Sequence, residues 1–237
     1  MTSVQVYNRG CCTFLTQPQM EDLAEWSSWF NNPLITQNLG SHEGKFHSPE
    51  SQLRYWQDET AKGRFFAIAR SFSAGMLGVL TSSELTPTNS FVSVVFPKVL
   101  PGSPLAALES TSLFVEYLFN ELNFERISVG QRYPSLKSWS QRLFLIGFQY
   151  EGLEQSGFFK TGTTNDIIRM GITRNHFNQI RSKRGGTLWP NDGEIMALMN
   201  RLDKALKEEI GMKSLTEYFA KSLNESLDFQ RTLLASI

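Results

Sequence analysis

The sequence has few of the residues from which a reactive or metal-binding site is most readily recognised. Its two cysteines, Cys11 and Cys12, are adjacent, so a disulfide between them would close a strained ring, and there is no Cys-x-x-Cys pair. No set of His, Cys, Asp and Glu has the spacing of a metal site, and the Gly-x-Ser-x-Gly and Gly-x-x-x-x-Gly-Lys motifs are missing. These absences exclude a dithiol redox centre, a serine-hydrolase elbow and a P-loop, and they predict no bound metal.

An excess of one charge and a long apolar run are absent as well. The 23 Lys and Arg residues balance the 23 Asp and Glu residues, and the sequence pI is ≈ 6.8. The longest apolar run, 143–148, is too short to span a bilayer, and the residues around Arg9 form no uninterrupted signal-peptide core. We therefore expect a cytoplasmic protein whose partners include neither nucleic acid nor a membrane.

Apolar residues make up 41% of the 237 positions, which is enough for one large domain or for one domain with an appendage. Eighteen phenylalanines favour an aromatic-rich core or a hydrophobic ligand channel. Apolar periodicity and turn residues predict the element order β-αα-βββ-α-β-α-ββ. The long helix leads from one strand to the next and makes one parallel pair, so we predict an α+β fold with a mixed, mostly antiparallel sheet flanked by helices.

The character of the chain changes near residue 175, where a basic turn at 181–186 precedes two helical stripes. We predict a main domain over 1–175 and a C-terminal helical extension over 176–237. The extension would pack on the main domain or on a second subunit as a homodimer, with a partner-binding helix pair as the alternative.

The most informative stretch is 91–122, where an apolar strand turns into a long amphipathic helix through Pro101-Gly102-Ser103-Pro104. Ser103 is suited to the N-cap and Pro104 to the first helical position, and the apolar stripe continues to Leu122. The free N–H groups and positive dipole end of such a helix can hold an anion. The alternative is an ordinary β-to-α connection.

Five strings, in the correct order and on the expected elements, show a resemblance to a known family. They are 25–36, 50–56, 117–127, the Gly-Phe-x-x-Glu-Gly segment at 147–152, and 160–166. Over about residues 10–175 the chain resembles the GNAT N-acetyltransferase superfamily, especially its branch of ribosomal-protein N-terminal alanine acetyltransferases.

The resemblance implies acetyl-CoA, or another acyl-CoA, as co-substrate and direct transfer of the acyl group to an amine. The pyrophosphate of the CoA would lie at the start of the long helix, and backbone donors of the preceding strand would polarise the thioester carbonyl. The cofactor-binding residues implied are Val94, Phe96, Gly102, Ser103, Leu105, Ala106, Ala107 and Ser135.

The sequence departs from the family pattern in the phosphate loop and in the acid. The loop is poor in glycine, and Pro101 and Pro104 lack N–H donors. Leu143 stands where the family often has the tyrosine that protonates the thiolate. Tyr133 is the alternative acid, and Ser135 and Ser138 replace a cofactor-binding asparagine, with Ser138 also counted as a catalytic candidate.

The general base has no clear counterpart either. Glu84, near the end of a strand, is the best candidate for the general base, although a solvated charge at a strand end is at least as good an interpretation. Glu109 in the first turns of the long helix is read as structural. Residues expected near the acceptor amine are Asn32, His42, His47 and Asp166.

We therefore expect an acyl-CoA-dependent N-acyltransferase acting on a peptide N-terminus, an amino sugar or another small amine. One alternative is a catalytically weakened CoA-binding or protein-interaction module, which the missing tyrosine and the proline-bearing loop favour. Another is a related enzyme that uses a longer acyl-CoA.

Overall fold

The computed structural model describes residues 5–37, 39, 46–72, 75–98, 105–133, 136–160 and 162–197. The predicted site residues His42, Gly102, Ser103 and Ser135, the side chain of Ser138, and most of the predicted C-terminal helices lie outside the described residues. Within the described part, no helix is long and apolar enough to cross a membrane.

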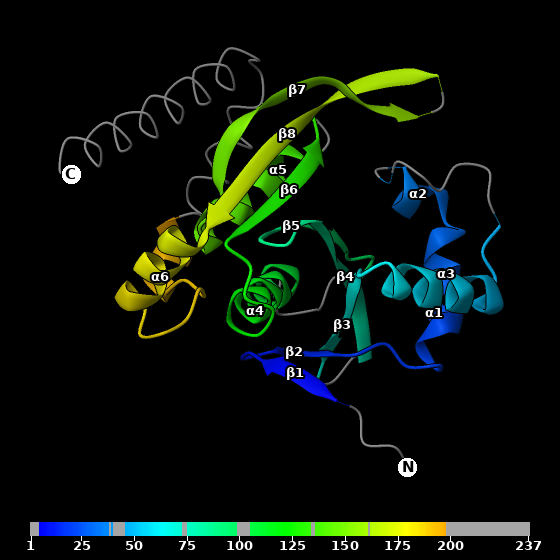
Figure 1. Cartoon of the computed structure of the whole chain (residues 1–237), viewed down its shortest axis with the longest axis horizontal. Coiled ribbons are helices and arrows are strands. Elements are labelled where there is room, and N and C mark those ends of the chain that lie inside the picture. Colours follow the sequence, from blue (N-terminus) through cyan, green and yellow to red (C-terminus); the bar gives the residue numbers. More distant parts are fainter. Residues whose placement is uncertain are drawn as a thin grey trace.

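One sheet of eight described strands forms the centre of the molecule (Figure 1). Its spatial order is β1-β2-β3-β4-β5-β6-β8-β7, and these strands pair antiparallel except β5 with β6, which pair parallel. The strands are β1 (Val6–Arg9), β2 (Thr13–Thr16), β3 (Phe65–Ser71), β4 (Gly75–Thr86), β5 (Asn89–Val95), β6 (Arg126–Arg132), β7 (Gln149–Lys160) and β8 (Thr163–Thr173). The predicted α+β class, mixed sheet and single parallel crossover are confirmed.

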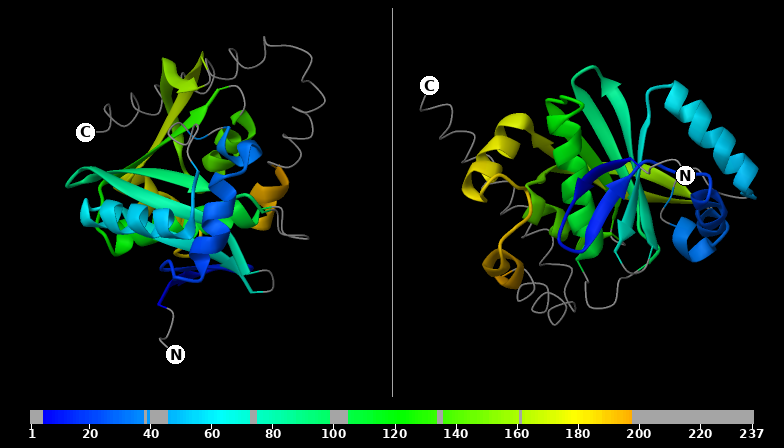
Figure 2. Two further views of the ribbon diagram at one scale, coloured as in Figure 1. Left: turned by 90° about the vertical axis from the view of Figure 1, so that its right-hand side faces the viewer. Right: turned by 90° about the horizontal axis from the view of Figure 1, so that it is seen from below.

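Helices cover both faces of the sheet. They are α1 (Asp22–Phe30), α2 (Pro33–Thr36), α3 (Pro49–Ala61), α4 (Ala106–Asn120), α5 (Lys137–Leu143), the short 3₁₀ turn η1 (Phe144–Ile146) and α6 (Arg174–Lys183). Figure 2 shows α4 on one side of β3–β5 and α1 and α3 on the other. Strand β1, which the sequence did not predict, extends the sheet beyond β2.

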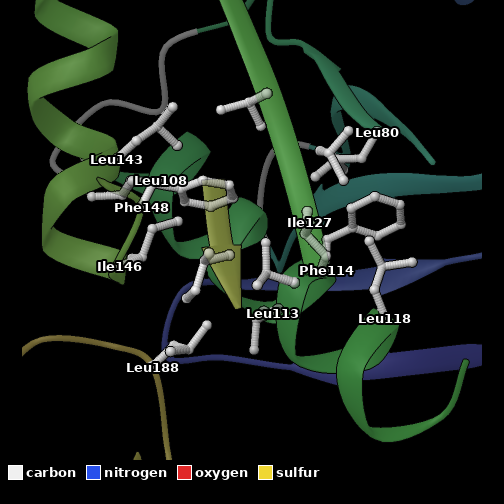
Figure 3. Packing of buried hydrophobic residues seen from close by; sticks show 14 of the residues in the cluster. Leu80, Leu108, Leu113, Phe114, Leu118, Ile127, Leu143, Ile146, Phe148 and Leu188 are labelled. Carbon is white, nitrogen blue, oxygen red and sulfur yellow. The ribbon is translucent and has the colours of Figure 1, made fainter. Parts of the chain in front are cut away.

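The alternation of side chains along the strands divides the interior into two cores. On one face Leu80 and Ile127 pack with Phe114 and Leu118 of α4, as Figure 3 shows. On the other face Ile68 packs with α1 in a second, smaller core. A side chain's position along β4 or β5 therefore indicates which helices it faces.

Helix α4 begins at Ala106, with Leu105 as its N-cap residue and no side-chain cap. The start predicted from Ser103 and Pro104 was therefore early by two residues, within the usual uncertainty of helix ends. The stripe at Leu108, Thr111, Val115 and Leu118 is buried as predicted. Leu122 lies beyond the helix and is 38% exposed, so its assignment to the stripe was wrong.

Glu109, which is 2% exposed, ties α4 to the turn between β1 and β2. Its Oε1 accepts a hydrogen bond from Cys11 N at 2.6 Å, and its Oε2 accepts from Cys12 N at 3.1 Å and from Thr13 Oγ1 at 2.7 Å. Because Gly10 has no Cβ, the carboxylate can approach this turn closely: a Cβ there would lie 2.6 Å from Glu109 Cδ. The charge near the start of α4 also favours the helix dipole.

Residues after β8 pack on the same core. Phe177 of α6 is fully buried and stacks on Phe119 of α4 with ring centroids 4.4 Å apart. Leu188 is also fully buried, and Glu116 of α4 accepts hydrogen bonds from Leu188 N and Thr187 Oγ1. The division of the chain at 175/176 stays a prediction, since residues 198–237 lie outside the described part.

Candidate functional site: a pocket between two diverging strands

Strands β5 and β6 separate after a short parallel contact. They pair at Asn89, Ser90 and Phe91 of β5 and no further among the described residues. Beyond that point β5 stays paired with β4 as far as Val95, and β6 stays paired with β8 as far as Arg132. The sheet therefore splits into two halves whose facing strand edges lack their usual partner, as the spread of β5 and β6 in Figure 1 shows.

A pocket of ≈ 810 Å³ lies at this split. Residues of both strands line it, among them Val94 and Phe96 on the β5 side and Gly130 and Gln131 on β6. Its volume falls in the range of small-molecule sites, and most of its lining residues are of apolar type, although polar atoms contribute much of the exposed wall. The pocket reaches both faces of the sheet, because its lining includes side chains that point toward α4 and α5 and others that point toward α1 and α3.

The side facing α4 and α5 is apolar with a few hydrogen-bonding groups. Val94, Thr111, Val129 and Trp139 line it together with Gln131. Gln131 is 4% exposed, and its Oε1 accepts a hydrogen bond from Ser140 Oγ at 3.2 Å. The fixed amide and the unpaired strand edges suit an extended chain that carries amide groups of its own.

A close approach of β4 and β5 shapes this side. The ring of Phe96 covers Gly78 of β4, where an added Cβ would meet Phe96 Cδ1 and lie 2.5 Å from Val95 O. The same ring packs against Trp139 of α5, with centroids 6.5 Å apart. Glycine at 78 thus lets an aromatic side chain close one end of the pocket.

The first turn of α4 lies one helical turn from the pocket. Thr111, which lines the pocket, donates a hydrogen bond from Oγ1 to Ala107 O at 2.7 Å. Ala106 is buried, and Leu105 and Ala107 are half-buried. The unpaired N–H groups at a helix start attract anions, and α4 is the next described element after β5 in the chain. Residues 101–104 of the predicted phosphate loop lie outside the described part.

The side facing α1 and α3 contains Tyr55 and Arg64 among apolar residues and a few neutral polar ones. Arg64 Nη1 donates to Tyr55 Oη at 2.6 Å and lies 3.2 Å from Glu59 Oε2. Burial raises the pKa of the Tyr55 hydroxyl, although the neighbouring arginine lowers it, so the phenol stays neutral near pH 7. Tyr55 and Arg64 line the pocket, and Glu59 is not among its described lining.

Two basic side chains fix the loop that closes this side. Lys160 of β7, 8% exposed, donates to the carbonyl oxygens of Thr36 and Leu39, and Arg132 Nη1 donates to Gln37 O at 3.0 Å. Positive groups at a helix C-terminus satisfy its last carbonyls. The pair therefore holds the end of α2 against β6 and β7.

The predicted site residues are placed very unevenly. Asn32, Val94 and Phe96 line the pocket. Asn32 Oδ1 also caps α2 by accepting from Leu34 N at 3.0 Å. Leu105, Ala106 and Ala107 lie at the start of α4 as expected, although they are not among the pocket's described lining.

Four other predicted residues do not line the described pocket. Glu84 is exposed near the far end of β4. Tyr133 packs against the main core, and its N–H donates to Asp166 O at 2.9 Å. Asp166 Oδ1 accepts from Ser156 N at 2.9 Å and supports a residue with φ 52°.

His47 belongs to the connection between α1 and α3 rather than to the pocket wall. Its Nδ1 lies 2.7 Å from Gln52 Nε2, and its backbone exchanges two hydrogen bonds with the side chain of Asn31. Sequence reasoning missed Tyr55, Arg64 and Gln131. The local signal for Gln131 was a polar residue inside an otherwise apolar strand, and Arg64, in the turn before β3, gave no such signal.

Comparisons with known proteins support the fold only. No protein-family model matches the sequence, and no curated protein matches it. Among solved structures, the spermidine N-acetyltransferase from Vibrio cholerae in complex with CoA and spermine superposes with a TM-score of 0.61 at 18% identity, over 70% of this chain and 98% of that one.

Two further structures give the same result. The RimL ribosomal L7/L12 alpha-N-protein acetyltransferase in complex with CoA has a TM-score of 0.62 at 12% identity, covering 71% of this chain and 98% of that one. A GNAT-family acetyltransferase from Bacillus anthracis has a TM-score of 0.60 at 12% identity, covering 72% and 99%. The chain therefore has the fold of the GNAT acetyltransferases.

Proposed function

We propose that this protein is an acyl-CoA-dependent N-acyltransferase, with acetyl-CoA as the expected donor and a primary amine as the acceptor. The observation that carries the proposal is the pocket between β5 and β6, which is lined from both faces of the sheet. Two substrates can enter such a pocket from opposite sides and meet between the strands. Two structural neighbours with CoA in their names support the choice of donor.

The residues present suit an acyl-CoA on the side of α4 and α5. The unpaired edge of β5 at Val94 and Phe96 offers backbone groups to the amides of a pantetheine chain, as an added strand would. The start of α4 at Leu105, Ala106 and Ala107 offers N–H groups to a phosphate. A bound acyl-CoA would supply the thioester, whose carbonyl the β5 backbone donors would polarise.

The transfer itself requires a neutral amine. The amine nitrogen attacks the thioester carbonyl carbon, the C–N bond forms, and the C–S bond breaks to release CoA as a thiol. The nitrogen loses one proton, and a thiolate gains one. No Asp, Glu or His is among the described residues that line the pocket, so ordered water carries the first proton in this proposal.

The finer assignments remain predictions. Glu84, Tyr133 and Ser138 are the proton-transfer residues predicted from the sequence; Glu84 and Tyr133 do not line the described pocket, so they would act through water. Asn32, His42, His47 and Asp166 are predicted to bind the acceptor. Three further predictions are a peptide acceptor like that of the ribosomal-protein branch, a cytoplasmic location, and a homodimer formed through residues 176–237.

A weakened enzyme that only binds CoA is the second candidate. The lack of a carboxylate or imidazole among the described lining favours it. A thiol-release assay separates the two candidates: acetyl-CoA is incubated with the full chain and a panel of amines, peptides and amino sugars, and free CoA is measured with a thiol-reactive dye. Amine-dependent release supports the enzyme, and binding without release by any acceptor supports the second candidate. Longer acyl-CoAs in the same assay test the donor's chain length.

A further inference from the structure

We infer that the acceptor is an amine that carries an anionic group, held by Arg64, on an apolar body. The inference rests on the proposed function and adds to it a substrate class and a residue that selects it. It excludes polyamines, which are acceptors in the name of a structural neighbour.

The position of Arg64 places it on the acceptor side. Arg64 immediately precedes β3, and its partner Tyr55 lies on α3, which covers the face of the sheet opposite α4. Thr81 and Ser93, directly paired on β4 and β5, line the pocket on that same face. An amine entering from this side approaches the split between the strands past Tyr55 and Arg64.

The one positive charge in the described lining of this side belongs to Arg64, and the Glu59 carboxylate lies 3.2 Å from it. Arg64 is the one ionised side chain among the described residues that line the pocket, because Tyr55 is neutral near pH 7. Asp and Glu are missing from that lining, although residues 40–45 of the neighbouring loop lie outside the described part. A polyamine would bring two or more ammonium groups beside the Arg64 guanidinium. The described lining has no carboxylate to pair with them, and the neighbouring Glu59 is already engaged by Arg64 and Lys62, so their desolvation is poorly compensated.

The guanidinium keeps donors free for a ligand. Tyr55 Oη and Glu59 Oε2 both contact Nη1, and no described residue is recorded on Nη2. The side chain is 30% exposed, so it is fixed by its partners yet still open to the pocket. A planar arginine fork matches the two oxygens of a carboxylate or phosphate.

The rest of this side selects an apolar body. Trp26, Phe30, Ile35, Leu39 and Phe158 line it, and Lys160 and Arg132 fix the loop that carries Leu39. An aromatic or branched aliphatic amine fills such a wall, while a flexible polar chain gains little from it.

Matched acceptors test the inference. With acetyl-CoA saturating, thiol release is measured for 4-(aminomethyl)benzoate, its neutral amide 4-(aminomethyl)benzamide, the corresponding aryl phosphate, and spermidine. Phenylalanine and phenylalaninamide repeat the comparison with the charge beside the amine. We expect kcat/KM to be about tenfold to a hundredfold higher for the anion than for its neutral partner, the worth of a charge-assisted hydrogen bond. The phosphate arm shows which anion the site prefers.

Variants assign the preference to one side chain. Arg64→Gln should abolish the difference in kcat/KM between the benzoate and the benzamide by lowering only the kcat/KM of the benzoate. Arg64→Lys should restore part of that difference. Lys62→Gln is the matched control, because Lys62 contacts the same Glu59 at 2.8 Å but is 70% exposed and does not line the pocket. Equal losses for both acceptors in Arg64→Gln, or a preference of the wild-type chain for spermidine, would overturn the inference.

Calorimetry keeps the inference separate from the proposed function. If no acceptor releases thiol, the proposed function fails. The anion site still stands if the benzoate binds saturably, the benzamide does not, and Arg64→Gln loses the binding. If wild type and Arg64→Gln bind the benzoate alike, or neither binds it, the anion site is refuted.

Discussion

Replacing Glu109 by glutamine tests how a single buried carboxylate holds α4 in the sheet. The carboxylate accepts from Cys11 N, Cys12 N and Thr13 Oγ1, and it is 2% exposed. Glutamine keeps one acceptor oxygen and turns an NH₂ group toward the donors that Oε2 now satisfies. The Thr13 hydroxyl can rotate to accept, but Cys12 N keeps only its longer contact with Oε1, at 3.4 Å.

The expected size of the effect follows from these contacts. Weakening the Cys12 N hydrogen bond costs about 0.5–1.5 kcal/mol, and loss of charge on the remaining bonds costs about 1 kcal/mol more. We therefore expect Glu109→Gln to lower the free energy of unfolding by about 1–3 kcal/mol. Urea titration followed by circular dichroism measures it, provided that the slope of the transition is unchanged.

Glu121→Gln is the control for this measurement, because Glu121 is an exposed residue just after the same helix. Its effect should stay within about 0.5 kcal/mol. A Glu109→Gln variant as stable as the Glu121→Gln control would refute the view that this carboxylate anchors the β1–β2 turn.

Three further predictions concern the packing around α6. Gly147→Ala should destabilise the fold by about 1–3 kcal/mol, because φ there is +91° and a Cβ would overlap Ile180. Gly152→Ala is the control and should leave the stability unchanged, because no atom lies within 4 Å of the added Cβ. Equal melting temperatures of the two variants would contradict this prediction. Burial lowers the pKa of His176 below the ordinary 6.5, so the unfolded chain binds the proton more readily and the stability of the fold falls as pH drops through 6.5. Between pH 7.5 and 5.5 the melting temperature of His176→Gln should therefore fall less than that of the wild type. Equal decreases in the two proteins would disprove the link between His176 protonation and stability. Phe177→Ala should cost about 3–5 kcal/mol in urea unfolding and Phe159→Ala, at a 63% exposed position, far less; similar costs would show that α6 is not part of the core.

The sequence predicted those features that depend on local patterns. Alternating apolar residues located most strands, and the stripe through Leu108 and Val115 located α4, because burial of one face imposes its period on the sequence. The segment at 147–152 was recognised only by family resemblance, and the positive φ of Gly147 (+91°) was not predicted. Strand β1 was missed because Val6–Arg9 is short, half-exposed and lacks a clear alternation.

The pocket could not be predicted in the same way. The separation of β5 from β6 depends on how far each strand stays paired with β4 and β8, which is a property of the assembled sheet. Arg64 and Tyr55 meet only when α3 folds back on the sheet, and nothing in their local sequence indicates a shared site. Family resemblance identified the elements and three lining residues, Asn32, Val94 and Phe96, but not Tyr55, Arg64 or Gln131.

The central claim is that an acyl-CoA binds between β5 and β6, and calorimetric titration with acetyl-CoA tests it most directly. Val94→Trp fills the pocket from the half-buried face of β5, and Val6→Trp on the distant strand β1 is the matched control, since Val6 is 38% exposed and outside the described lining. We expect saturable one-to-one binding by wild type and by Val6→Trp, and at least about tenfold weaker binding by Val94→Trp, the effect of losing roughly 1.4 kcal/mol. No heat with the wild-type chain, or equal affinity in all three proteins, would contradict the account.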